Sequence, residues 1–99
     1  MAGFVQIIEW KTSRIDEVEQ VNEEWRERFP EMGPTRILVG GDRDNAGSYV
    51  TVVEFESHEA AMKNSADPAT EEFAGRMAEL CDGPPTFRNL DVMRVENRA

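Results

Sequence analysis

The sequence predicts a ferredoxin-like α+β fold, in which an antiparallel four-stranded sheet carries helices on one face. Three observations predict it. The chain has 99 residues, which fits a single domain over residues 1–99 without a second core. A strand pattern occurs twice, at residues 4–10 and 49–55, and both copies read aromatic, Val, polar, two β-branched residues, Glu, aromatic. A helix start follows each copy, so the expected order is β-α-β-β-αα-β.

The first half of the chain contains a strand, a helix and a second strand. The helix is expected over residues 14–29, with Ser13 as its N-cap, because apolar residues recur there on one helical stripe. A second strand is expected over residues 35–40, before a turn rich in Gly, Asp and Asn. The residues of the apolar stripe are Ile15, Val18, Val21, Trp25 and Phe29.

The second half repeats this order with an interrupted helix. Ser57 is the expected N-cap before a short helix over residues 60–66. Asp67 and Pro68 then restart a helix, as N-cap and first-turn proline, which ends near Gly83. Residues 86–95 alternate as a last strand.

Composition and charge exclude several classes of partner. The chain has 20 acidic and 11 basic residues, a net charge of −9, and no Lys/Arg cluster, so nucleic acid and anionic membranes are poor partners. No apolar run approaches the roughly 20 residues needed to span a bilayer, and the first residues lack the pattern of a signal peptide. We therefore expect a cytoplasmic protein. Cys81, the only cysteine, is either a reactive thiol or a small buried side chain, and we favour the second.

Both faces of the repeated strands are largely apolar, so both need to be covered. We expect the two strands to be central neighbours that run parallel to each other, each with an antiparallel partner on its outer side. Helices cover only one face, and a second sheet from an identical chain would cover the other, which predicts a homodimer. The bulkier, aromatic face is expected to lie toward the helices and comprises Phe4, Gln6, Ile8, Trp10, Tyr49, Thr51, Val53 and Phe55.

The opposite face ends in Glu9 and Glu54, which parallel pairing would place side by side. Paired carboxylates do acid–base work or bind a metal ion. The alternative is a pair of ion pairs at a dimer-facing sheet, with Arg88 beside Glu9 and Arg36 beside Glu54. We favour the ion pairs, because both arginines have the matching alternation phase.

A few uncharged polar residues interrupt the apolar helix-facing surfaces and indicate a ligand cleft. Asn22 lies within the apolar stripe of the first helix, and Asn64 falls among small residues of the short helix. A buried amide needs hydrogen-bond partners, which come either from the protein itself or from a ligand. Such a cleft suits a flat organic ligand better than a phosphorylated one. The predicted ligand-binding residues are Gln6, Trp10, Asn22, Trp25, Thr51, Asn64 and Phe73.

No pattern in the chain identifies a catalytic residue. His58 is the only histidine, so a three-histidine metal site cannot form, and we expect His58 to be exposed in a first helical turn, away from the apolar face. Glycine-rich phosphate loops are absent. We therefore expect no metal and no cofactor.

The element order, together with residues 53–65 (VEFESHEAAMKNS) and their continuation from Pro68 to Phe73, resembles the dimeric α/β barrel superfamily and its antibiotic-biosynthesis-monooxygenase-like group. The resemblance implies homodimers whose helix–sheet cleft binds small aromatic or polyketide-like molecules. Some such proteins oxidise these molecules with molecular oxygen and no cofactor, and others degrade haem. Many carry a histidine near the position of Asn64, and the haem-degrading ones use a histidine on the later helix, where residues 68–82 have none.

Two functions follow from this resemblance and the predicted cleft. The first is a cofactor-independent monooxygenase that acts on an aromatic or polyketide-like small molecule. The second is a non-catalytic protein of the same fold that binds a small molecule or serves as an accessory protein.

Overall fold

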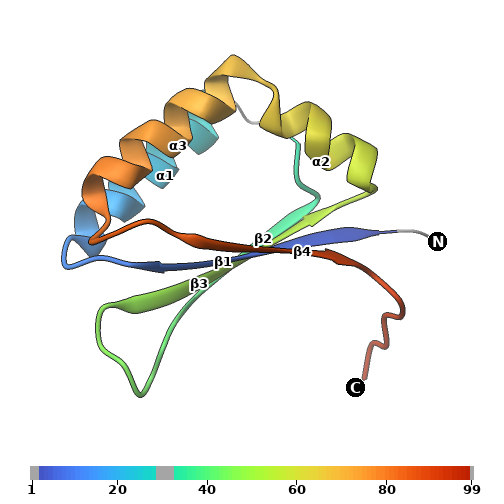
Figure 1. Ribbon diagram of the computed structural model, residues 1–99, viewed down its shortest axis with the longest axis horizontal. Coiled ribbons are helices and arrows are strands. Elements are labelled where there is room, and N and C mark those ends of the chain that lie inside the picture. The colour runs from blue at the N-terminus through green and yellow to red at the C-terminus, as the bar shows by residue number, and fades with distance from the viewer. Residues whose placement is uncertain (1–2, 29–32, 99) are drawn as a thin grey trace.

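The structure of the protein is a computed structural model that describes residues 3–28 and 33–98. The observed order is the predicted one, β-α-β-β-αα-β, and all four strands join one sheet in the order β2-β3-β1-β4 (Figure 1). Every neighbouring pair is antiparallel, which confirms the ferredoxin-like α+β fold. The elements are β1 (Phe4–Lys11), α1 (Ile15–Arg28), β2 (Arg36–Gly41), β3 (Ser48–Phe55), α2 (His58–Ser65), α3 (Pro68–Leu80) and β4 (Thr86–Asp91).

The expectation that the repeated strands run parallel is wrong. β1 and β3 are the central neighbours, but Phe4 pairs with Phe55 and Trp10 with Tyr49, so the strands run in opposite directions. The cause is the hairpin between β2 and β3. β2 runs parallel to β1 one position away, and the turn over residues 42–47 reverses the chain, so that β3 opposes both strands between which it lies.

Helices α1, α2 and α3 lie on one face of the sheet, and within the described part of the chain no helix covers the other face (Figure 1). The predicted aromatic face is the one toward the helices. Its residues Phe4, Val53 and Phe55 form the buried core with Ala61 of α2. Helix α1 buries Val18, Val21 and Trp25, as its predicted stripe requires; Phe29, also placed in that stripe, lies outside the described residues.

The helix starts are as predicted in two cases and different in the third. Ser57 accepts a hydrogen bond from the backbone N–H of Ala60 at 3.1 Å, and Asp67 accepts one from Ala69 at 2.9 Å, so both are N-caps. Before α1, which begins at Ile15, it is Thr12 and not Ser13 that bonds to the backbone: its side chain accepts from the N–H of Arg14 at 2.9 Å, in a turn that precedes the helix. Thr12 takes this role because it is buried and also donates to the carbonyl of Leu80 at 2.6 Å.

The last strand is shorter than expected, because β4 ends at Asp91 and not near residue 95. Asp91 pairs with Phe4, the first residue of β1, and one more bond joins the N–H of Val92 to the carbonyl of Gly3 at 2.9 Å. Among the described residues, which begin at Gly3, there is no further backbone partner for β4 on that side. Across the two described ranges, no helix has the length and apolar content needed to cross a membrane.

Candidate functional site

The helices cover the two ends of the helix-facing sheet surface more completely than its middle. On β1, Phe4 and Trp10 are only 3% and 7% exposed, whereas Gln6 and Ile8 between them are half-buried. Thr51 of β3, directly opposite Ile8, is half-buried as well. In Figure 1, α2 lies toward one end of the strands and the α1–α3 pair toward the other.

The edge strands extend this partly uncovered surface. Residues directly opposite each other in an antiparallel pair point to the same face. The side chains of β2 and β4 on the helix-facing side are therefore Ile37, Val39, Phe87, Asn89 and Asp91. Three of them are apolar and well exposed: Ile37 (58%), Val39 (44%) and Phe87 (53%). We call the whole surface the central strip; it consists of Gln6, Ile8, Ile37, Val39, Thr51, Phe87 and Asn89.

The polar side chains of the central strip take part in two hydrogen bonds, one of them to Trp10 at the end of the sheet. Gln6 Nε2 donates to Asn89 Oδ1 at 3.1 Å, and Trp10 Nε1 donates to Thr51 Oγ1 at 2.8 Å. The Trp10 ring also stacks on Tyr49, with ring centroids 4.8 Å apart. Three predicted site residues, Gln6, Trp10 and Thr51, are therefore close together on the sheet.

A second group of predicted residues joins α1 to α3. The rings of Trp25 and Phe73 lie 5.4 Å apart, and the guanidinium groups of Arg28 and Arg76 lie 5.1 and 5.4 Å from the Trp25 ring. Arg76 also forms an ion pair with Glu24 at 3.2 Å. Trp25 is buried and Phe73 half-buried, so this group closes the space between the two helices.

The two predicted asparagines are both half-buried. Asn22 flanks the buried stripe of α1, next to Val21. The Asn64 side chain packs against Gly33, whose φ is +45°; a Cβ placed on that glycine would lie 2.2 Å from Asn64 Oδ1. Asn64 therefore packs against the loop before β2, in addition to the ligand contact that we predict for it.

The sequence analysis did not predict the residues that the edge strands β2 and β4 contribute to the central strip. Phe87 and Asn89 on β4, and Ile37 and Val39 on β2, were not among the predicted site residues. Their alternation phase relative to the repeated strands could have placed them on the helix-facing side. Their exposure could not have been predicted, because it depends on where the helices sit.

The carboxylate pair is not formed, and the ion pairs are confirmed. Antiparallel pairing puts Glu9 opposite Val50 and Glu54 opposite Val5, toward opposite ends of the strands. Arg36 contacts Glu54, and Arg88 Nη2 lies 3.9 Å from Glu9 Oε2. Among the described residues, no group of three or more His, Cys, Asp and Glu side chains is arranged to hold a metal ion.

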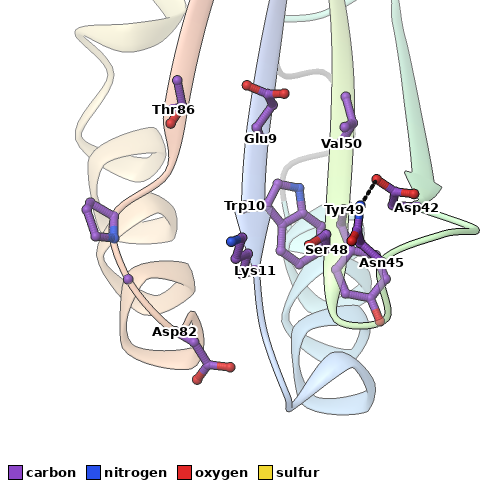
Figure 2. Close-up of a pocket in the computed structure, with 12 residues that line it drawn as sticks. Glu9, Trp10, Lys11, Asp42, Asn45, Ser48, Tyr49, Val50, Asp82 and Thr86 are labelled. Atoms are coloured by element: carbon purple, nitrogen blue, oxygen red, sulfur yellow. Dashed lines mark hydrogen bonds between the residues drawn. The ribbon is translucent and has the colours of Figure 1, made fainter.

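An open depression of about 580 Å³ lies at the Trp10 end of the sheet (Figure 2). It is bordered by the end of β1, the turn between β2 and β3, and the turn before β4. Carboxylates of Glu9, Asp42 and Asp82 line it together with Lys11, so its chemistry differs from that of the uncharged central strip. Of the seven predicted residues, only Trp10 lines it.

The two side chains with the most reactive chemistry lie outside the central strip. His58 is exposed at the first turn of α2, as expected, with its ring 5.1 Å from that of Phe4. Cys81 is half-buried after α3. Burial raises the pKa of the Cys81 thiol, and the neighbouring Asp82 carboxylate raises it further. A raised pKa disfavours the thiolate, in line with the small buried side chain that the sequence favours.

Protein-family models give no match to this chain, and neither do curated proteins. Solved structures match over nearly the full length. A candidate antibiotic biosynthesis monooxygenase from Caulobacter crescentus is 15% identical, covers 94% of this chain and 92% of its own, and has a TM-score of 0.80. SnoaB, a cofactor-independent oxygenase from Streptomyces nogalater, is 18% identical, covers 95% of both chains, and has a TM-score of 0.77. A conserved protein from Methanosarcina mazei is 11% identical, covers 91% of this chain and 92% of its own, and has a TM-score of 0.78.

These likenesses define the class to which the fold belongs. The chain has the ferredoxin-like fold of the antibiotic-biosynthesis-monooxygenase-like proteins, which confirms the predicted resemblance at the level of fold. At such low identity, fold alone does not determine activity.

Proposed function

We propose that the protein is a cofactor-independent monooxygenase that binds an aromatic or polyketide-like small molecule between the central strip and the helices. The observation that carries the proposal is the strip itself. It is a largely apolar surface on the helix-facing side, left partly uncovered in the middle of the sheet and supplied with uncharged hydrogen-bonding groups. Such a surface suits a flat ring system with a few polar atoms. The oxygenase named among the proteins of similar structure supports the same reaction class.

The chemistry demands little from the protein. A ring ketone with a methylene group across the same ring, such as an anthrone, loses a proton from that methylene to give an electron-rich enolate that can itself reduce molecular oxygen. One oxygen atom enters the ring as a new carbonyl, and the other leaves as water with the two methylene hydrogens. The protein has to orient the ring and stabilise the enolate oxygen. In this proposal, Asn22 and Asn64 donate hydrogen bonds to the ring oxygens, Gln6 forms a hydrogen bond to a polar group of the ring, and Phe73 packs on the ring.

The second candidate function is binding without turnover. One observation favours it, because none of the seven predicted residues has an ionisable side chain that could act as a general base near neutral pH. A protein of this kind would hold or deliver the same class of molecule. It would share the cleft and differ only in the absence of oxygen consumption.

Oxygen uptake separates the two functions. The protein is mixed with a panel of anthrones and quinols, and oxygen consumption is followed beside ligand binding. The monooxygenase predicts uptake above the rate of spontaneous oxidation, lowered by Asn22→Leu and unaffected by Gln20→Leu on the exposed side of the same helix. Binding without uptake would establish the second function. Absence of binding across the panel would contradict both.

We also propose that the protein is a homodimer formed through the helix-free face of the sheet. On a single chain this face leaves Leu38 54% and Leu90 46% exposed. The Arg36–Glu54 and Arg88–Glu9 ion pairs lie on the same face, toward opposite ends of the strands. An apolar centre with charged groups around it is the usual anatomy of a dimer interface. The apolar residues are Val5, Ile7, Leu38, Val50, Val52 and Leu90.

A further inference from the structure

The hydrogen bond between Gln6 and Asn89 lies within the central strip at its β4 edge. The two residues are directly opposite each other on β1 and β4, on the helix-facing side. The next helix-facing pair along these strands is Ile8 and Phe87, and the Phe87 ring is 53% exposed. The amide pair therefore adjoins an uncovered aromatic and aliphatic surface.

The bond determines which polar atoms remain for a ligand. A glutamine or asparagine amide carries one acceptor oxygen and two N–H donors. Gln6 donates one N–H to Asn89, and the side-chain oxygen of Asn89 accepts it. The groups left over are the Gln6 oxygen, which accepts, and the second Gln6 N–H and the Asn89 N–H groups, which donate. An acceptor and a donor thus stand next to each other at the rim of an apolar surface.

We propose that Asn89 is a specificity-determining residue of this site, a proposal that rests on the function proposed above. Asn89 donates to a ring carbonyl of the ligand, and its own oxygen holds the Gln6 amide so that Gln6 Oε1 accepts from a hydroxyl beside that carbonyl. The preferred ligands are flat ring ketones with a hydroxyl on the carbonyl edge. A ring without the hydroxyl would desolvate Gln6 Oε1 and leave it unpaired, which is the kind of mismatch that polar sites reject.

Two stable ligands test this without turnover. One is unsubstituted anthraquinone, and the other is anthraquinone with a hydroxyl on each side of one carbonyl. Affinities are measured by quenching of tryptophan fluorescence, and the ratio of the two affinities is the readout. For the unaltered protein we expect the hydroxylated ligand to bind about tenfold more tightly, the effect of one unpaired acceptor.

Three variants assign the preference to Asn89. Asn89→Leu should weaken both ligands and reduce the ratio to about one, because Gln6 is no longer held. Asn89→Asp should weaken both ligands yet keep the ratio, since a carboxylate oxygen still accepts from Gln6. Asn97→Leu, which removes an exposed asparagine from the C-terminal segment, should change neither affinity.

Each outcome bears on the proposal. A ratio near one for the unaltered protein, or a ratio that survives Asn89→Leu, would overturn the role of Asn89 and leave the proposed function standing. Loss of the ratio in Asn89→Asp as well would also overturn it, because Gln6 would then not be held through the Asn89 oxygen. If the unaltered protein bound neither ligand, the binding function itself would fall and the inference with it.

Discussion

The indole N–H of Trp10 donates to the hydroxyl oxygen of Thr51 at 2.8 Å, across the two central strands. Trp10 is 7% exposed, so its N–H has little access to water. The bond therefore fixes the ring at the end of the sheet, where it also stacks on Tyr49. A polar position inside an apolar sheet face is in this case part of the core.

Thr51→Val should destabilise the protein by about 1–3 kcal/mol, because it leaves the buried Trp10 N–H without its acceptor while keeping the side-chain shape. The free energy of unfolding is measured in urea by circular dichroism. Thr86→Val, at an exposed position of β4, is the matched control and should change stability by less than about 0.5 kcal/mol. In a Trp10→Phe background the Thr51 substitution should cost little, and an equal cost in both backgrounds would disprove the coupling.

Thr12→Val should destabilise the protein by about 1–3 kcal/mol, more than Ser13→Ala. Thr12 is buried, donates to the Leu80 carbonyl at 2.6 Å and accepts from the N–H of Arg14 at 2.9 Å. Valine leaves both backbone groups without this partner. Ser13 is exposed, so its loss should cost less than about 0.5 kcal/mol. Thermal melting of the two variants compares them, and a larger loss for Ser13 would restore it as the helix cap.

Thr51 and Thr12 illustrate which parts of the structure the sequence predicts and which it does not. Element order and the two sheet faces follow from alternation and capping patterns, which are local. The direction of β3 relative to β1 was wrong, because the similarity of the repeats says nothing about which strand lies between which. The end of β4 was misplaced for a related reason. β4 stops at Asp91 because Asp91 pairs with Phe4, the first residue of the neighbouring strand β1.

The candidate site likewise has residues that the sequence predicts and residues that it does not. Gln6 and Thr51 were predicted because they interrupt an apolar pattern, and the structure puts each in a hydrogen-bonded pair. Asn89 and Phe87 were missed because a polar or apolar residue on an edge strand is unremarkable in sequence. Only the position of the helices leaves the middle of the sheet uncovered, and that position depends on long-range packing, such as the contact of Trp25 in α1 with Phe73 in α3.

Leu38→Lys should convert the proposed dimer to monomers. Leu38 lies on the helix-free face opposite Val52 and is already 54% exposed on one chain, so a lysine there disturbs the isolated fold little. In a closed interface the same charge would be buried without a partner. Sedimentation at micromolar concentration measures the mass. Val95→Lys, at a position 71% exposed outside the sheet, should leave the dimer intact. A monomeric unaltered protein would contradict the proposed assembly.

Alkylation of Cys81 should begin at higher pH in the folded protein than in the unfolded chain. Burial and the Asp82 carboxylate raise the pKa of the Cys81 thiol, and only the thiolate reacts. The folded state therefore holds its proton more tightly. The stabilisation linked to this thiol is present below the unfolded pKa and is lost as pH rises through the folded pKa. Rates with iodoacetamide against pH measure the shift. Asp82→Asn should lower the folded pKa only in part, and a folded pKa below the unfolded one would contradict the assignment.

Gly33→Ala should destabilise the protein by about 1–2 kcal/mol and also weaken ligand binding. Alanine at a φ of +45° is strained, and its Cβ would lie 2.2 Å from Asn64 Oδ1, so the Asn64 side chain has to move. Gly75→Ala, in α3 with no atom near the new Cβ, is the opposite case and should stabilise the helix by up to about 1 kcal/mol. Asn64→Ala in the Gly33→Ala background relieves the clash but not the backbone strain. The double variant should therefore recover part of the stability in a urea titration, but none of the affinity for the anthraquinones. Recovery of affinity in the double variant would mean that Asn64 makes no contact with the ligand, and that the loss came from the displaced side chain obstructing the site.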